Sequence, residues 1–94
     1  MYNVRAIDID MPTSYRAFEA RVVVEKDAEI LSVINLDGNI VINVMYADNS
    51  ESLFTIFEFF RCNDKLPTTI GTERRFIDTV VCDNNIFHVF ERIS

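Results

Sequence analysis

The chain has few of the residues that usually mark turns, with two glycines and two prolines among its 94 residues, and it has no tryptophan. Its only cysteines, Cys62 and Cys82, are too few for the disulfide framework of a small secreted scaffold, so we expect free thiols. No apolar run approaches the ~20 residues that a membrane-spanning helix requires. The first ten residues include Arg5, Asp8 and Asp10, whereas a signal peptide would be apolar there. These absences predict a cytoplasmic protein without a membrane partner.

Length and composition predict a single folded domain over residues 1–94. Two independent cores would need roughly 50 residues each. Apolar residues make up 49% of the chain and charged residues 26%, close to the ordinary globular average. Acids outnumber bases by 15 to 9, which disfavours nucleic acid as a partner because phosphate contacts need clustered Lys and Arg. A basic protein partner fits this charge better.

The middle third of the chain, residues 31–60, has acidic residues and no Lys or Arg. Two interpretations remain open for these carboxylates. They are either solvated turn and strand residues that keep the protein soluble, or charges that face a basic partner. The residues are Asp37, Asp48, Glu51 and Glu58.

Apolar residues recur mostly with a period of two and are rich in Val, Ile, Phe and Tyr, which is typical of β-strands. Asp37-Gly38 tolerates positive φ and predicts a tight hairpin turn, and residues 83–85 predict a second one. A helix over residues 13–26 is the minority alternative, because three consecutive valines disfavour it. The polar segments 48–51 and 62–74 are expected to be a turn and a long loop. The predicted strands are residues 2–10, 16–25, 29–36, 39–47, 52–61, 75–82 and 86–93, of which the first has only partial alternation.

The strand predicted over residues 52–61 is apolar on both faces. Four phenylalanines fall within seven positions and cannot all point to one side. Either the strand is central in a sandwich or closed barrel, or one face is an exposed aromatic patch that meets a partner or a second copy. The phenylalanines are Phe54, Phe57, Phe59 and Phe60.

No catalytic, cofactor or metal site is recognisable. His88 is the only histidine and lacks a nucleophile in a known motif, so we interpret it as a structural hydrogen-bonding residue. Cys62 and Cys82 supply at most two of the four ligands that structural zinc needs. Asp8 and Asp10 share one strand face, but no second acidic pair or phosphate-binding loop accompanies them. The sequence therefore predicts a protein that is not an enzyme.

Two segments resemble a family of short uncharacterised proteins from bacteriophage and prophage genomes. Residues 24–33 (Val-Glu-Lys-Asp-Ala-Glu-Ile-Leu-Ser-Val) are similar to the family's Ala-x-Ile-Leu-Ser-Val strand. Residues 76–80 (Phe-Ile-Asp-Thr-Val) and 86–91 (Ile-Phe-His-Val-Phe-Glu) resemble its closing hairpin with an aromatic-His-Val-Phe-Glu signature. The family's central Trp and its Gly-Thr-Gly motif near Cys62 are missing here. The resemblance implies a viral origin and a β-rich fold, and assigns no catalytic residue.

We therefore expect an all-β fold, an antiparallel meander of five or six strands that forms a small sandwich or partly open barrel. The favoured function is a phage accessory protein that binds a host protein stoichiometrically and inhibits it by occlusion, for example in a defence system. One alternative is a homo-oligomeric assembly module that uses residues 52–61 as its contact. Another is a small-ligand binder or enzyme that uses His88 with Asp78 or Glu91. The candidate interface residues for the favoured function are Asp37, Asp48, Glu51, Glu58 and Phe60.

Overall fold

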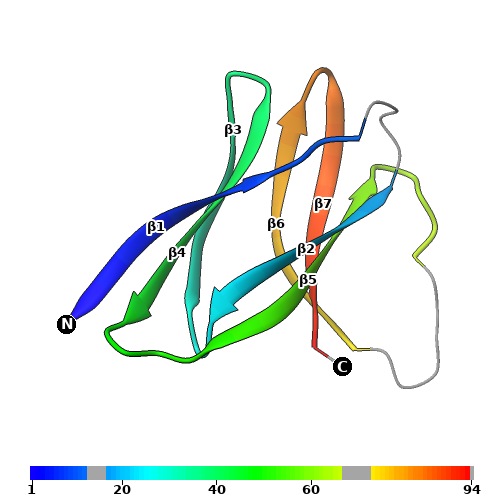
Figure 1. Ribbon diagram of the computed structural model, residues 1–94. Helices are drawn as coiled ribbons and strands as arrows, with labels where there is room; N and C mark the ends of the chain where they lie inside the picture. The colour runs from blue at the N-terminus through cyan, green and yellow to red at the C-terminus, as the bar shows by residue number, and fades with distance from the viewer. Residues whose placement is uncertain (13–16, 67–72, 94) are drawn as a thin grey trace.

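The computed structural model describes residues 1–12, 17–66 and 73–93, and every regular element in them is a β-strand (Figure 1). The predicted all-β class is confirmed. Residues 13–16 and 67–72, which include the start of the strand predicted over 16–25 and part of the long loop, lie outside the described residues. The strands are β1 (Tyr2–Ile9), β2 (Phe18–Glu25), β3 (Glu29–Leu36), β4 (Asn39–Ala47), β5 (Ser52–Arg61), β6 (Arg74–Cys82) and β7 (Asn85–Arg92).

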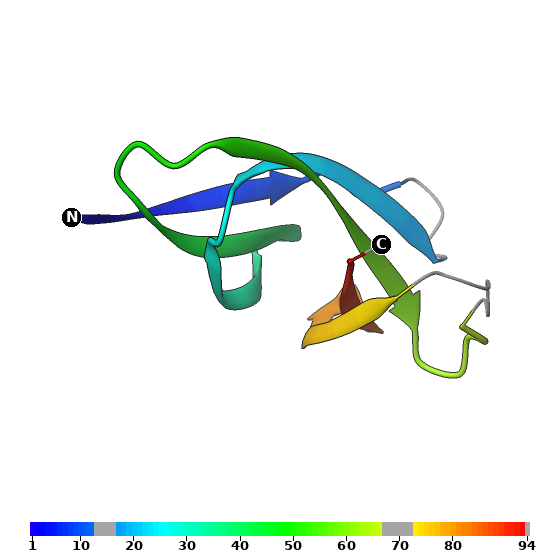
Figure 2. The same ribbon diagram turned by 90° about the horizontal axis from the view of Figure 1, so that it is seen from below.

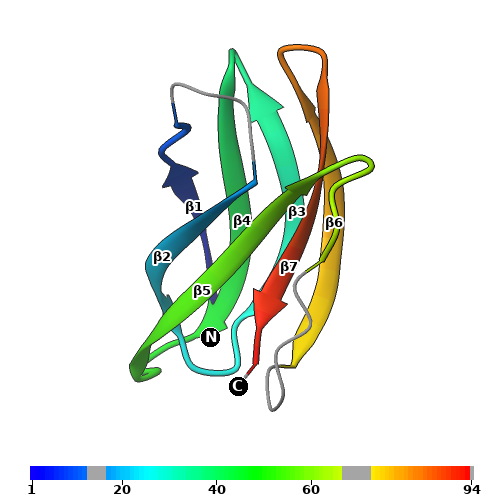
Figure 3. The same ribbon diagram turned by 90° about the vertical axis from the view of Figure 1, so that its right-hand side faces the viewer.

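The strands form two antiparallel sheets packed as a sandwich. One has the order β1-β4-β3 and the other the order β2-β5-β7-β6. Figure 3 views the molecule from the side of the four-stranded sheet. The fold has seven strands rather than five or six. The expected meander is not formed, because only the hairpins β3–β4 and β6–β7 pair strands that are consecutive in sequence.

The departure from a meander arises at two short turns that change sheets. Residues 26–28 lead from β2 in one sheet to β3 in the other, and residues 48–51 lead back from β4 to β5. Figure 2 shows β5 crossing from the end of β4 toward β7. Each turn is polar and short enough to be a hairpin, so local sequence alone does not distinguish the two outcomes.

Both hairpins end in two-residue turns with positive φ. Asp37 and Gly38 have φ of 52° and 88°, and Asp83 and Asn84 have φ of 48° and 64°. Two successive left-handed residues make the turn that matches the twist of antiparallel strands. The Asn35 side chain also accepts a hydrogen bond from Gly38 N at 2.8 Å. The two predicted hairpins are confirmed, the second with a turn of two residues rather than three.

The hydrophobic core lies between the sheets and draws on all seven strands. In β2 the predicted alternation is confirmed, since Val24 is buried while Arg21 and Val23 face outward. In β5 the inward residues are Phe57 and Phe59, and the Phe59 ring stacks on Phe18 at 4.6 Å between centroids. The buried core residues are Ile7, Ile9, Val24, Val33, Ile40, Ile42, Val44, Phe57, Phe59, Val80, Cys82, Phe87 and Val89.

The two sheets are joined at their edges by side chains. At the β1–β2 seam, Arg5 Nε donates to the Glu25 carboxylate at 2.9 Å and Arg5 Nη2 donates to the Val23 carbonyl at 2.7 Å. At the β3–β6 seam, the Asp78 carboxylate accepts a hydrogen bond from Val33 N at 3.2 Å. In a closed barrel, backbone groups at these edges would hydrogen-bond to a neighbouring strand. Here the Val23 carbonyl and Val33 N bond to side chains instead. The architecture is therefore intermediate between an open sandwich and a closed barrel.

Candidate protein-binding surface

The outer face of the three-stranded sheet carries several exposed apolar side chains. In β1, Ile7 and Ile9 point into the core, so Tyr2 and Val4 point outward, with exposed fractions of 69% and 64%. Directly paired residues of antiparallel strands share a face, and Met45 pairs with Val4. We call this surface the three-stranded face. Its exposed apolar residues are Tyr2, Val4, Ala6, Ile34 and Leu36, while Met45 is half-buried and Val41 is buried. Its polar residues include Asp8, Glu29, Ser32 and Asn43.

Carboxylates gather at both ends of the three-stranded face. Residues 1–12 and 26–51, which supply this sheet and its turns, hold seven acids against two bases. Of the two bases, Arg5 is paired with Glu25 and Lys26 is exposed. The strand register places Asp8, Asp10 and Asp37 at the end of the β3–β4 turn, and Asp27, Glu29, Asp48 and Glu51 at the opposite end. Tyr2 and Val4 therefore lie at the end that holds Glu29 and Asp48, because Tyr2 pairs with Ala47 and Val4 shares the row of Met45 and Glu29.

Three of the predicted interface residues border this face. Asp37 lies at the exposed tip of the β3–β4 hairpin, and Asp48 and Glu51 are exposed in the turn before β5. Asp48 also accepts a hydrogen bond from the Asn3 side chain. The structure brings Asp48 and Glu51 together and places Asp37 at the far end of the sheet.

Glu58 lies on the other sheet and is buried, with an exposed fraction of 3%. Arg74 Nε donates to Oε1 at 2.7 Å and Arg92 Nη2 donates to Oε2 at 2.8 Å. Burial alone would raise the pKa of Glu58, but the hydrogen bonds from Arg92 and Arg74 outweigh it and hold the pKa below its ordinary value. Hydrogen bonds to Glu58 and Glu19 raise the pKa of Arg92. Glu58 is thus a neutralised structural charge that cannot steer a partner.

Phe60 is also covered, although it points away from the core. Its exposed fraction is 8%, and its ring packs edge-on against Phe90 at 5.9 Å between centroids. Phe90 makes a similar contact with Phe76 at 5.5 Å. On the same strand face, Phe54 is 85% exposed. The strand is central in its sheet, as the first interpretation predicts. It also presents one exposed aromatic side chain, Phe54, as the second predicts.

His88 does not join either carboxylate that the sequence suggested. Its Nδ1 lies 3.0 Å from the Thr79 hydroxyl on the outer side of the sheet. Asp78 and Glu91 have the opposite strand parity, and Asp78 binds Val33 across the seam. A His–carboxylate pair at this position is therefore not formed.

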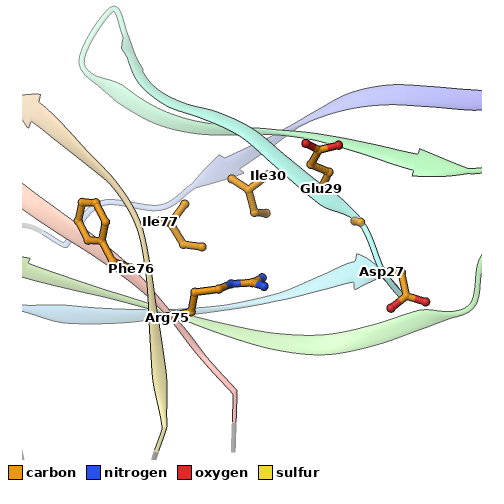
Figure 4. A pocket seen from close by; sticks show the side chains of 7 residues that line it. Asp27, Glu29, Ile30, Arg75, Phe76 and Ile77 are labelled. Carbon is orange, nitrogen blue, oxygen red and sulfur yellow. The ribbon is translucent and has the colours of Figure 1, made fainter.

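A cavity of about 410 Å³ opens between the lower ends of the two sheets (Figure 4). Ile30 from β3 and Ile77 from β6 face one another across it. Asp27 and Glu29 border one side and Arg75 the other, and Arg75 forms an ion pair with Glu91 from β7. The cavity offers both charge signs and no nucleophile, so its residues do not form a recognisable reaction centre.

The remaining reactive side chains are separate from one another. Cys62 is exposed and Cys82 is buried in the core, and neither forms a disulfide. Burial, together with the charge of Asp83, raises the pKa of the Cys82 thiol. Within the part of the chain that the structure describes, no group of three or more His, Cys, Asp and Glu side chains could hold a metal ion. The same residues include no helix of the length and apolarity that crossing a membrane requires.

Comparison with known proteins finds no matching family, no similar curated protein and no similar solved structure. The three-stranded face is therefore the feature from which function is inferred.

Sequence reasoning did not identify the three-stranded face. Tyr2, Val4 and Ala6 alternate correctly, but Ile7 and Ile9 are apolar on the opposite parity. The sequence predicts only partial alternation for this strand. In the structure it marks a strand with one apolar side against the core and another toward solvent. The presence of apolar residues at both even and odd positions of residues 2–9 was the sequence feature that could have indicated this surface.

Proposed function

We propose that this chain is a non-enzymatic protein-binding module whose three-stranded face docks on a basic, partly apolar surface of another protein. The observation that carries the proposal is the combination of exposed Tyr2 and Val4 with carboxylates at both ends of the same sheet. Contiguous exposed apolar residues rimmed by charge are typical of interaction surfaces.

The two parts of the surface have different physical roles. Tyr2 and Val4 supply apolar area that is desolvated on contact, and tyrosine is enriched among residues that dominate binding energy. The carboxylates at the ends raise the rate of encounter with a positively charged partner and repel acidic ones. The affinity of this face would therefore come from apolar contact at Tyr2 and Val4, and its association rate would depend on salt.

The resemblance to short phage proteins favours a host protein as the partner. A compact stoichiometric binder with no recognisable reaction centre acts by covering the partner's own functional surface. Inhibition of a host protein by occlusion, for example one from a defence system, is the form of this function that we favour.

The proposal is tested by affinity capture from a bacterial lysate with three tagged proteins. The wild type is compared with Val4→Asp, which replaces an exposed apolar side chain by a charge, and with the double variant Asp48→Lys/Glu51→Lys. Val4 is 64% exposed, so its replacement leaves the fold intact. Phe54→Ala, on the opposite sheet, is the matched control.

The expected result is one abundant basic protein that the wild type and the Phe54→Ala control retain and that both three-stranded-face variants lose. Association rates measured with that protein should fall as ionic strength rises, and the double variant should remove most of this dependence. Equal capture by Val4→Asp and the wild type would contradict the proposal.

A further inference from the structure

Two charged side chains occupy core-facing positions at one end of the sandwich, the lower end in Figure 1. Glu91 has the same parity on β7 as Phe87 and Val89, which are buried in the core. Arg75 pairs directly with Glu91 in the strand register and therefore lies on the same face of the sheet. The two side chains form an ion pair, and that of Arg75 is still 58% exposed. Charged residues rarely face the interior of a small domain, and such exceptions are typical of functional sites.

The inward direction of Arg75 depends on a β-bulge. The register of β6 with β7 shifts between Phe76 and Asp78, so Ile77 is an extra residue. After the bulge, even-numbered residues such as Val80 are buried and odd-numbered ones are exposed. Before the bulge the parity is reversed, and Arg75 takes an inward position that an unbroken strand would turn to the outside.

A second bulge lies opposite the first, on β3. Its register with β4 shifts between Ile30 and Ser32, so the extra residue there is Leu31. Beyond the two bulges, hydrogen bonds from Val33 N and from the Asn35 side chain join β3 to β6. At the bulges and before them, the cavity of about 410 Å³ separates the two strands. Bulges are over-represented next to active sites, where they redirect a side chain or end strand pairing.

Arg75 can bind a second carboxylate while it keeps Glu91. Its Nη2 donates to Glu91 Oε1, and a guanidinium has several further N–H donors in a planar fork. Figure 4 shows the Arg75 side chain directed into the cavity. Two further cavities of about 380 and 260 Å³ are also lined by Arg75, so its guanidinium lies at the centre of the open end.

Two carboxylates border the same cavity from the other sheet. Asp27 lies in the turn before β3 and Glu29 is the first residue of that strand, and both are exposed. Neither forms an ion pair or a side-chain hydrogen bond with another residue of the described part of the chain. They are therefore available to a positively charged group.

The charges of the cavity indicate which class of ligand it fits. An anion alone would meet Asp27 and Glu29, and a cation alone would make no use of the Arg75 donors. A small zwitterion satisfies both, because its two charges lie close together and have opposite signs. An apolar group attached to it can pack between Ile30 and Ile77, which face one another across the cavity. The volume of about 410 Å³ lies near the lower end of the range of small-molecule sites, roughly 300–1,000 Å³.

We propose that the open end of the sandwich binds a free α-amino acid with an apolar side chain. Arg75 receives the α-carboxylate, and Asp27 and Glu29 receive the α-ammonium group. The apolar side chain lies between Ile30 and Ile77. This site is separate from Tyr2 and Val4 on the outer surface and does not depend on the binding of a basic protein.

The test is an NMR titration of the untagged full chain with L-leucine and with L-phenylalanine, each to about 50 mM. At least one of them should shift the amide signals of residues 27–30 and 75–77 in a saturable way, with a Kd of roughly 1 mM or lower. Isoamylamine lacks the carboxylate of leucine, and isocaproate lacks its ammonium group. Each should bind at least ~10-fold more weakly than leucine.

Three variants locate the site. Arg75→Gln and Asp27→Asn should each weaken binding ~10-fold or more with little change in melting temperature, because both side chains are exposed. Asp37→Asn is the matched control at the other end of the molecule. Asp27 and Asp37 both lie in turns with positive φ, 60° and 52°, which asparagine also adopts. The control should bind like the wild type.

The absence of a saturable shift with both amino acids would overturn the proposal. Binding of isoamylamine or isocaproate as tight as that of leucine would overturn it too, because one charge would then suffice. Wild-type affinity in Arg75→Gln would also contradict it. These titrations use the protein alone, so their outcome does not affect the capture of a basic protein by the three-stranded face, and the two proposals fail separately.

Discussion

Replacing Glu58 with Gln should destabilise the protein strongly at neutral pH. The side chain keeps its shape, but the carboxylate that receives two arginines is lost. Arg74 reaches both carboxylate oxygens, at 2.7 and 3.3 Å, and Arg92 reaches one at 2.8 Å. An amide has one acceptor oxygen, and its NH₂ group would face a guanidinium N–H. At least one of these hydrogen bonds is therefore broken.

The magnitude follows from burial. Hydrogen bonds to charged groups contribute ~1.5–3 kcal/mol each, and breaking a fully buried ion pair costs ~3–5 kcal/mol. Arg74 and Arg92 are partly exposed and recover some hydration, which lowers the cost. We expect a loss of about 2–3 kcal/mol, which lowers the melting temperature of a domain this size by roughly 10–20 °C. Glu19→Gln, which removes an exposed partner of Arg92, should cost less than ~1 kcal/mol.

The pH dependence gives a second readout. The folded-state pKa of Glu58 is lowered, so its contribution is present above the unfolded-state pKa of ~4.3 and is lost as pH falls through the folded value. The difference in unfolding free energy between wild type and Glu58→Gln should be largest above ~pH 6 and shrink below ~pH 4. Urea unfolding of both proteins at several pH values measures it. Equal stability at pH 7, or a difference that does not vary with pH, would refute this account of Glu58.

Two further substitutions separate packing from exposure and test a turn. Phe60→Ala should lower the free energy of unfolding by ~3 kcal/mol, because the ring is buried against Phe90. Phe54→Ala should change it by less than ~0.5 kcal/mol, because that ring is exposed. Similar losses for the two variants in thermal melts would contradict this difference. Gly38→Ala should cost ~1–2 kcal/mol although its added methyl has open space, because Gly38 has φ of 88°; urea unfolding that shows no loss would mean that the turn relaxes.

Local features of the chain were predicted well because they depend on neighbouring residues. Asp37-Gly38 determined the turn type, and the alternation of residues 18–25 identified which side of β2 is buried. Both signals act over a few residues, where backbone φ preferences and the two-residue period of a strand dominate.

The division of the strands between two sheets could not be predicted in the same way. Residues 26–28 and 48–51 have the polar composition of hairpin turns, yet each carries the chain to the opposite sheet. Strand pairing depends on contacts between distant segments, such as Tyr2 with Ala47, which local alternation does not encode.

The candidate surface was only partly predictable for a related reason. The sequence predicts that Glu58, an acidic residue between apolar neighbours in a strand, faces solvent or a partner. Its burial depends on Arg74 and Arg92, which come from two other strands. Asp37, Asp48 and Glu51 lie in turns, where composition alone predicts exposure correctly.

The assignment of β2 to the second sheet has a consequence for synthesis on the ribosome. The strands of the three-stranded sheet are complete once Ala47 has been made, with β2 already in the nascent chain between β1 and β3. β2 ends at Glu25, but its partner β5 is complete only at Arg61, which is 36 residues later. At about 5–20 residues per second this interval lasts roughly 2–7 s. During that time the inward side chains of β2 have no strand of their own sheet to pack with, so the nascent chain depends on the early three-stranded sheet to shield them.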